Sequence, residues 1–209
     1  EELAAVAEVV DVVEEPGRAL HGVALEPREA LERELARAGV GHLIVADRDF
    51  VELHNLQRQL LFDEQDLADN LPKAAAAERK LRAINSDIEV QGRVTDVNAE
   101  NIEDLIEGDT LVMDGTDNFE TRYILNDACL KQNIPWIYSG AVATYGISQT
   151  IIPGQTACLR CHFEEIPPPG TNATCDTAGV VGPVVAAVAS VSATEAIKLI
   201  VGQGELNRG

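Results

Sequence analysis

The sequence predicts an α/β fold, with a mostly parallel β-sheet and helices on both of its faces. Short apolar stretches alternate with amphipathic stretches through the middle of the chain, which is the pattern of repeated strand–helix units. Hydrophobic residues make up 45% of the 209 residues and aromatic residues only 4%. We therefore expect one large α/β domain with a core built mainly from Ala, Val, Ile and Leu.

The first part of the chain carries the weakest signals. The stretch AAVAEVVDVVEE (residues 4–15) fits either a helix or a strand, and Pro16-Gly17 interrupts it. A helix is predicted over residues 27–39, because Pro suits the first turn, apolar residues recur on one face and Gly is a stop signal. We therefore divide the chain into a divergent segment, residues 1–30, and a domain, residues 31–209.

Later elements are predicted by their apolar periodicity and by the residues at their ends. Further helices with Pro or Asn at the start and Gly or Asn at the end are expected at residues 72–85, 98–108 and 119–133. Apolar strands are expected at residues 42–47, 88–94, 110–113 and 134–142, followed by an extended segment at 145–154 that ends in a turn.

Charge and hydropathy exclude several classes of partner. The net charge of −19 and the pI of about 4.4 disfavour nucleic acid and anionic lipid. The acidic start of the chain lacks the basic region of a signal peptide. The uncharged run Thr177–Thr194 is rich in small residues and contains Pro183, so we interpret it as a buried loop plus helix and not as a membrane span. These features predict a cytoplasmic protein.

Acidic side chains follow two of the predicted strands. Asp47 and Asp49 come after one strand, and Asp114 and Asp117 come after another. In an open parallel sheet, ligands bind beyond the carboxyl ends of the strands, where an acid suits a ribose diol or a divalent ion. Any one of these acids taken alone fits better as a solvated loop charge in a weak surface ion pair, whereas the set together favours a binding site.

Cations accompany these acids. Arg58 and Lys73 follow the first strand end, and both side chains suit phosphate. Acids for ribose and metal, together with cations for phosphates, indicate a nucleoside triphosphate.

Several motifs in a fixed order make the sequence similar to a known family. They are LARAGVGHLIVADRDFVELHNLQRQ (residues 35–59), the lysine after Pro72, DGTDNFETR (114–122), a CxxC pair, TCDTAGVVGP (174–183) and ATEAIKLIVG (193–202). In these motifs the chain resembles the MoeB/ThiF/HesA family, the bacterial relatives of ubiquitin-activating enzymes. The resemblance runs collinearly from about residue 35 to about residue 204. It implies a Rossmann-like adenylation domain at residues 31–209.

The resemblance also implies an activity. Members of this family use Mg-ATP to adenylylate the C-terminal Gly-Gly carboxylate of a small β-grasp sulfur-carrier protein, and they release pyrophosphate. The chemistry joins two anions, so cations and Mg²⁺ must neutralise charge as it develops. The expected cofactors are therefore ATP and Mg²⁺. The expected partners are the carrier protein, a sulfur-donor protein and a second copy of the chain in a homodimer.

Individual roles follow from the matched motifs. In the resemblance, Asp47 holds the ribose, and the phosphates are contacted by Asn55, Arg58, Gln59 and Lys73. Asp117 serves Mg²⁺ and catalysis, with Asn118 beside it. Asp49 and Asp114 are kept as supporting acids only.

Cysteines supply the remaining candidates. Cys158 and Cys161 match half of the family's structural Zn²⁺ site, although a lone CxxC is also compatible with a redox pair. His162 is a geometrically poor substitute for a missing ligand. Cys175 matches a cysteine that some relatives use for a covalent link, and a buried structural thiol is the equal alternative. Cys129 is expected in the core.

The chain departs from the family at both ends. The phosphate-binding glycines are expected at positions 23, 25 and 28, where this sequence has Val23, Leu25 and Arg28. The second cysteine pair of the zinc site has no match. Three explanations remain open: a fragment, a divergent pairing subunit without ATP, or a first strand rebuilt from AEVVDVV (residues 7–13).

Two other functions compete with the adenylyltransferase. A non-catalytic scaffold that binds the carrier is favoured by the missing glycines. A nicotinamide-dependent oxidoreductase is favoured only by the general α/β pattern, and it leaves NLQRQ, DGTDN and CxxC unexplained.

Overall fold

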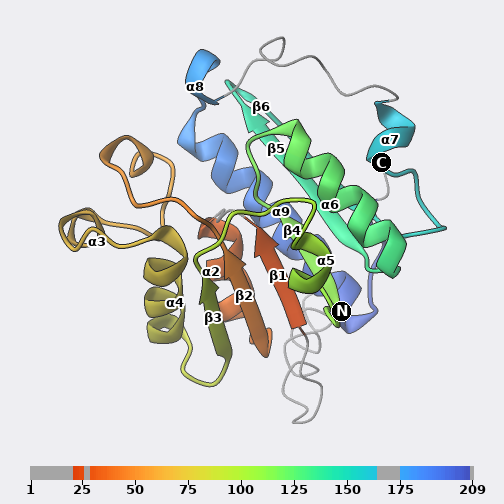
Figure 1. Cartoon of the computed structure of the whole chain (residues 1–209), viewed down its shortest axis with the longest axis horizontal. Helices are drawn as coiled ribbons and strands as arrows, with labels where there is room; N and C mark the ends of the chain where they lie inside the picture. Colours follow the sequence, from red (N-terminus) through yellow and green to blue (C-terminus); the bar gives the residue numbers. More distant parts are fainter. Residues whose placement is uncertain (1–20, 26–28, 164–174, 208–209) are drawn as a thin grey trace, which may run out of the picture.

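The structure, a computed structural model, describes residues 21–25, 29–163 and 175–207. Its centre is a six-stranded sheet with the strand order β3-β2-β1-β4-β5-β6 (Figure 1). Strands β1 to β5 are parallel, and β6 pairs with β5 in the antiparallel direction. The strands are β1 His21–Leu25, β2 His42–Ala46, β3 Glu89–Arg93, β4 Leu111–Asp114, β5 Trp136–Val142 and β6 Tyr145–Ile151. The predicted mostly parallel sheet is confirmed.

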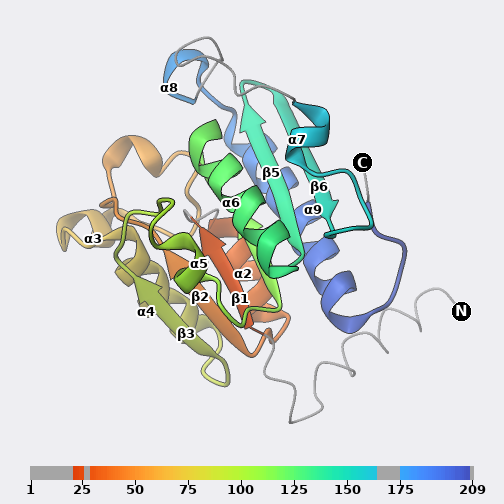
Figure 2. The same cartoon turned by 45° about the vertical axis from the view of Figure 1, so that its right-hand side comes forward.

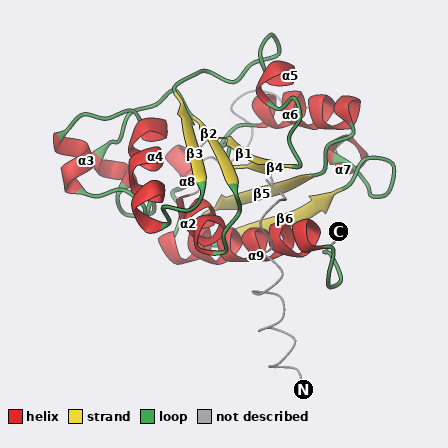
Figure 3. Ribbon diagram, turned by 90° about the horizontal axis from the view of Figure 1, so that it is seen from below, coloured by secondary structure: helices red, strands yellow, loops and turns green. Residues whose placement is uncertain are grey.

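Helices connect these strands. They are α2 Glu29–Arg37, η1 Leu53–Asn55 (a 3-10 helix), α3 Glu64–Ala68, α4 Lys73–Ile84, α5 Ile102–Leu105, α6 Phe119–Gln132, α7 Leu159–His162, α8 Cys175–Ala178 and α9 Gly182–Val201. Figure 3 shows α5 and α6 on one side of the sheet and α2 and α9 on the other, so both faces are covered as the sequence predicts.

Alternation along the strands divides the core into two clusters. In β2, Leu43 and Val45 join the cluster under α2, α4 and α9, whereas Ile44 and Ala46 join the cluster under α5 and α6. The same alternation places Met113 on the first face and Val112 on the second. Successive side chains of a strand point to opposite faces, so each buried strand needs apolar residues at every position.

One predicted helix is much shorter than expected. The expected helix at 98–108 is a single turn, α5, because the preceding residues form a turn stabilised by their own side chains. Asn101 Oδ1 accepts a hydrogen bond from the Asn98 amide (3.0 Å), and Asn98 Oδ1 accepts one from the Glu100 amide (2.9 Å). Asparagine side chains compete with helical hydrogen bonds in this way. The long polar segment after β2 also contains η1 and α3, which were not predicted.

The first strand of the sheet corrects another expectation. Strand β1 lies between β2 and β4, and it is formed by His21–Leu25. The hypothesis that residues 7–13 take this place is therefore wrong, and those residues lie outside the described part of the chain. Positions 23 and 25, where phosphate-binding glycines were expected, are strand residues: Val23 is in register with Ile44 and Leu25 with Ala46. Thus β1 and the start of α2 extend the fold into the segment at 1–30.

The far edge of the sheet is an antiparallel hairpin covered by the longest described helix. Figure 2 shows β5 and β6 side by side, with α9 behind them. The expected extended segment at 145–154 is confirmed as β6, and Gly154 turns the chain with φ 73°. By length and apolar composition α9 passes the test for a membrane span, a test that core helices of soluble proteins also pass. The helix buries Val188 and Ala193, but Val191 is exposed, so the expected loop plus helix is buried on one face only.

Candidate active site at the carboxyl ends of β2 and β4

Asp47 comes directly after β2 and is held at the edge of the sheet. Its amide donates to the Arg93 carbonyl at 3.1 Å, which prolongs the pairing of β2 with β3. Its carboxylate accepts a hydrogen bond from the Asp49 amide, and the residue is only 3% exposed. Burial raises the pKa of Asp47 to about 6, against the opposing positive charge of Lys73. Asp47 is therefore a buried acceptor whose charge depends on nearby cations.

Lys73 is the first residue of α4 and is tied to the turn after β2. Its amide donates to the Asp49 carbonyl (2.7 Å), and its Nζ donates to Asp49 Oδ2 (3.3 Å). The Lys73 side chain is 10% exposed and that of Asp49 is 59% exposed. The structure therefore brings Lys73 next to Asp47 and Asp49, which lie more than twenty positions earlier in the sequence.

The motif NLQRQ forms a compact turn around η1. The Asn55 carbonyl accepts the amides of Arg58 (3.0 Å) and Gln59 (2.9 Å). Asn55 Oδ1 and Gln59 Oε1 are buried and have no hydrogen-bond partner among the residues that the structure describes. Arg58 donates to the His54 carbonyl at 3.2 Å. Two unsatisfied buried acceptors are costly in a closed protein, and a ligand with donor groups or a bridging water would satisfy them.

The N-terminus of α9 packs against the backbone of this turn. A Cβ built on Gly182 would lie 2.8 Å from the Gln57 carbonyl oxygen and 3.8 Å from Arg58 Cα. A side chain at position 182 would therefore displace the backbone that carries Arg58. Here glycine is required by a close approach between two segments.

Asp114, the last residue of β4, belongs to a fully buried polar network. Its Oδ1 accepts from the amide (2.8 Å) and hydroxyl (2.7 Å) of Thr116. Its Oδ2 accepts from Arg122 Nε (3.1 Å) and from the Ser139 amide (3.3 Å). Both Asp114 and Thr116 are 0% exposed. The supporting role expected for Asp114 is consistent with this geometry, because it braces the segment that follows β4.

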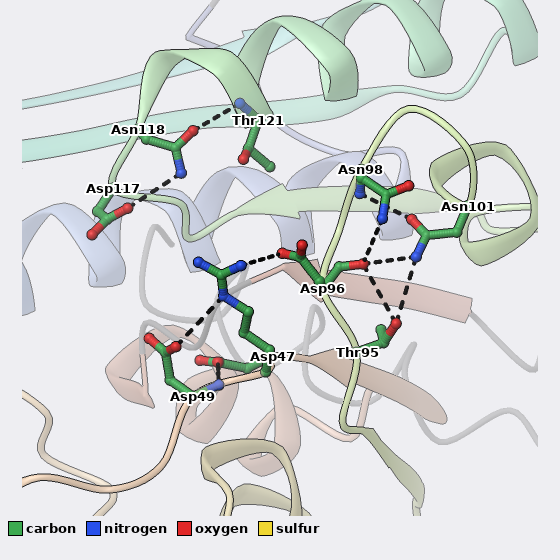
Figure 4. Close-up of polar contacts among 10 residues, drawn as sticks. Asp47, Asp49, Thr95, Asp96, Asn98, Asn101, Asp117, Asn118 and Thr121 are labelled. Carbon is green, nitrogen blue, oxygen red and sulfur yellow. Dashed lines mark hydrogen bonds and ion pairs between the residues drawn. The ribbon is translucent and has the colours of Figure 1, made fainter. Parts of the chain in front are cut away.

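Asp117 and Asn118 stand at the start of α6. Asn118 is the N-cap of the helix and accepts the Thr121 amide at 2.8 Å, a common arrangement for asparagine. Its Nδ2 donates to Asp117 Oδ1 at 3.3 Å. Figure 4 shows this pair in one view with Asp47 and Asp49, each group beyond the carboxyl end of its own strand. The Asp117 residue is exposed, which suits a group that meets a ligand or ion.

A buried glutamate near Asp47 was not predicted. Glu32, in α2, is 0% exposed, and within the described part of the chain neither carboxylate oxygen has a hydrogen-bond partner. Burial, followed by the negative charge of Asp47, raises the pKa of Glu32 to about 8. Helical spacing gives the only sequence signal, since Glu32 lies on the apolar face next to Leu31 and Leu35.

Arg48 and Asp96 form a second unpredicted contact at this edge. Arg48 Nη1 donates to Asp96 Oδ1 at 3.0 Å, which joins the residues after β2 to those after β3. Figure 4 shows Asp96 in a turn organised by Thr95, Asn98 and Asn101, whose side chains bond within the turn. This pair is largely exposed, with side-chain exposures of 66% and 57%.

The predicted cysteine sites have mixed outcomes. Cys158 and Cys161 lie together, with their sulfur atoms 3.6 Å apart. Burial raises the pKa of the Cys158 thiol, but hydrogen bonds from Cys161 and from nearby groups lower it overall. His162 Nε2 contacts Gln149 Nε2 at 2.9 Å. Cys129 is fully buried, which confirms its expected place in the core.

The donor groups of the described residues suit Mg²⁺ better than Zn²⁺. Within the described ranges, no three His, Cys, Asp or Glu side chains are placed to hold one ion. The two thiols supply half of a tetrahedral zinc site. A magnesium site needs less from the protein, because Mg²⁺ usually binds one or two carboxylates together with substrate phosphates. Asp117 fits that role. Cys175 begins α8, and its side chain lies outside the described part.

Comparisons with known proteins identify the family and several relatives of the chain. The ThiF family matches residues 30–209. The chain is 52% identical over 169 residues to the sulfur carrier protein ThiS adenylyltransferase of Bacillus subtilis, covering 81% of this chain and 50% of that protein. It is 40% identical over 171 residues to the SAMP-activating enzyme E1 of Haloferax volcanii, covering 82% of this chain and 62% of that protein.

A solved structure shows the same fold. The crystal structure of Escherichia coli MccB with ATP has a TM-score of 0.76 and 23% identity, and the match covers 95% of this chain and 60% of that one. The chain spans about half the length of the Bacillus subtilis relative. The two named sequence relatives are a sulfur carrier protein adenylyltransferase and a SAMP-activating enzyme. Since the family match and these relatives cover most of the sequence, the chain belongs to the ThiF family.

Proposed function

We propose that the chain is the nucleotide-binding domain of an adenylyltransferase acting on a small sulfur-carrier protein. The observation that carries the proposal is the turn after β2, where buried Asp47 lies beside Lys73 and its partner Asp49. A buried acceptor and a buried cation at the same strand end suit a nucleotide, with the acceptor facing the ribose and the cation facing the phosphates. The named relatives support the carrier as the acceptor of the adenylyl group.

Each side chain has a role in this proposal. Asp47 binds the ribose hydroxyls, while Arg58 and Lys73 bind phosphates. Asn55 and Gln59 orient the same phosphates or their bound waters. Asp117 holds Mg²⁺, and Asn118 fixes the position of Asp117.

The reaction transfers AMP to a carboxylate. A terminal carboxylate oxygen of the carrier, ending in Gly-Gly, attacks the α-phosphorus of ATP. The bond from the α-phosphorus to the bridging oxygen breaks, and that oxygen leaves with its electrons as pyrophosphate. Bound Mg²⁺ supplies charge neutralisation for the leaving group. The residues around Asp47 and Lys73 hold the two anions in line.

The remaining expectations join this proposal. A sulfur-donor protein consumes the acyl-adenylate, with Cys175 as the thiol for a covalent link. Cys158 and Cys161 bind Zn²⁺ only if two further ligands come from outside the described residues. The exposed face of α9, with Val191 on the helix and Val181 at its N-cap, is proposed as part of a homodimer interface.

Calorimetric titration with Mg-ATP tests the nucleotide site. We expect one binding site for the wild type, with affinity lost in Arg58→Ala and kept in Arg82→Ala. Arg82 is a matched control because it carries the same charge and donates to the Val90 carbonyl at the far end of α4. Equal affinities in the two variants would remove Arg58 from the site.

Pyrophosphate exchange tests the chemistry. With Bacillus subtilis ThiS as the probe carrier, we expect ATP–pyrophosphate exchange by the wild type and none by Asp117→Ala. A scaffold is the second candidate, favoured by the strand residues Val23 and Leu25 where glycines were expected. It predicts binding of ThiS without exchange.

A further inference from the structure

We propose that Arg122 is a positioning residue of the reaction, which orients the Asp117 carboxylate by clamping the segment between β4 and α6. This inference rests on the proposed function for its kinetic consequences. The clamp itself, meaning the contacts of Arg122 with Asp114, Thr116 and Ser139, is a property of the fold. Among the site predictions made from the sequence, Arg122 appeared only as the last letter of the DGTDNFETR motif.

Arg122 reaches three separate parts of the chain. The residue is 7% exposed. Its Nε donates to Asp114 Oδ2 at the end of β4, and its Nη2 donates to the Thr116 carbonyl and to the Ser139 carbonyl in β5 (3.4 Å). Only a planar guanidinium presents donors in a fixed fork that suits several acceptors at once.

Two aromatic rings hold the guanidinium in place. Its central carbon is 5.5 Å from the ring centroids of both Phe119 and Tyr138. Arginine is attracted to aromatic faces at this range. The group is therefore held by ring contacts as well as by hydrogen bonds, and its orientation is fixed from several directions.

The clamp leaves little freedom for Asp117. Both backbone polar groups of Thr116 are hydrogen-bonded: its amide donates to Asp114 and its carbonyl accepts from Arg122. Asn118 is fixed as the N-cap of α6. Asp117 lies between these two fixed residues, and Asn118 Nδ2 also donates to its carboxylate.

Charge adds to the geometry. Arg122 and Asp114 compensate each other inside the network, and the charge of Asp117 also acts on Arg122. Asp117 is thereby held near a cation while remaining exposed at the surface. Reacting groups positioned in advance react faster than groups that must find their geometry, because the ordering cost is met before the reaction.

Arg122→Lys is the informative substitution, because lysine keeps the positive charge and loses the fork. We expect kcat for ATP–pyrophosphate exchange with ThiS to fall about 10- to 100-fold, and KM for ATP to change less than about threefold. The matched control is Arg82→Lys, in which an arginine bound to the Glu78 carboxylate and the Val90 carbonyl is changed away from the site. The control should keep both constants.

A readout independent of activity accompanies the kinetics. In NMR spectra of the full chain, Arg122→Lys should shift the Asn118 side-chain amide signals and the carboxyl carbon signal of Asp117. Wild-type protein without exchange would contradict the proposed function, and the NMR result would then decide the clamp by itself. Unchanged Asn118 and Asp117 signals would overturn the inference, as would a kcat loss matched by an equal loss of folded protein.

A second variant covers a folding failure. If Arg122→Lys does not fold, Asp114→Asn combined with Arg122→Gln removes both charges together. The same loss of kcat and the same changes at Asn118 are expected. A fully active double variant would overturn the positioning role.

Discussion

Asp114 and Glu32 are both fully buried acids near the proposed site, but their surroundings are opposite. Asp114 receives hydrogen bonds at both oxygens from Thr116, Arg122 and Ser139. Glu32 receives none from the described residues, and its pKa is raised to about 8. The comparison shows that burial alone does not define the state of a carboxyl group. A carboxylate with partners fixes structure, whereas one without partners keeps a proton and destabilises the fold at neutral pH.

The largest effect is expected when the Asp114 network is broken. Arg122→Gln would leave Asp114 buried and uncompensated, so the free energy of unfolding should fall by about 3–5 kcal/mol. Urea denaturation at pH 7 measures this loss. A decrease below about 1 kcal/mol would mean that Asp114 recruits another partner or takes up a proton.

The next effect concerns Glu32 and has a definite sign with pH. In the folded state Glu32 keeps its proton up to a pKa of about 8, whereas the unfolded chain loses it near the usual value of 4.5. The unfolded state therefore binds fewer protons between these values, and stability should fall as the pH rises, by about 1.4 kcal/mol per pH unit. Asp47 and Asp109 act in the same direction at lower pH, with pKa values raised to about 6 and about 7.

Glu32→Gln isolates the contribution of this residue. In this variant the free energy of unfolding should fall less steeply between pH 5 and pH 8, as measured by urea denaturation across that range. At pH 7 the loss of unfolding free energy should be about 3 kcal/mol smaller than in the wild type. Glu34→Gln, in the same helix and only partly buried, is the control. Identical pH slopes in wild type and Glu32→Gln would show that Glu32 gains a partner in solution.

A smaller effect is expected at Lys73, which lies beside the buried acid Asp47 and pairs with the exposed acid Asp49. Its charge lowers the pKa of Asp47 against the effect of burial. Lys73→Met should raise the pKa of Asp47 further above its usual range, which carboxyl NMR titration measures. The free energy of unfolding should change by about 1 kcal/mol or less, because the partner carboxylate of Asp49 is largely exposed. A lowered pKa of Asp47 would contradict the assigned electrostatics.

The smallest effect is expected at Arg160 and Asp127, an exposed ion pair of the same kind as the buried pair of Arg122 and Asp114. Arg160 binds the Asp127 carboxylate of α6 through two nitrogens (2.9 and 2.6 Å) and lies over the Tyr123 ring. Both side chains are nearly half exposed. Arg160→Gln should therefore cost less than about 1 kcal/mol in the same denaturation assay. A cost equal to that of Arg122→Gln would show that burial is not the deciding variable.

Sequence patterns predicted the elements whose signal is local. The helix at 72–85 appears as α4, and the strands after Gly41 and Thr110 appear as β2 and β4, because apolar runs and terminal Pro or Gly act over a few residues. The helix at 98–108 was overestimated. Its apolar spacing is correct, but the Asn101 side chain binds the Asn98 amide and the Asn98 side chain binds the Glu100 amide, and periodicity does not report such competition.

The site was predictable only in part, for a related reason. Asp47 and Asp117 were identified because each follows an apolar strand, and strand ends of a parallel sheet share one edge. The Asp49–Lys73 contact and the threefold reach of Arg122 depend on how helices pack against that edge. The helical spacing of Glu32 places it on the apolar face of its helix, but only the packing of α2 shows that this charged residue is fully buried.

Gly182 gives the fold an unexpected dependence between distant segments. Because the Gln57 carbonyl lies where a Cβ would be, the start of the longest described helix and the turn that bears Arg58 fit together as complementary shapes. Which substitutions are tolerated at position 182 therefore depends on the backbone of Gln57 and Arg58. A library that randomises the turn for new anion selectivity should leave position 182 as glycine, and a library that remodels the helix should begin after it.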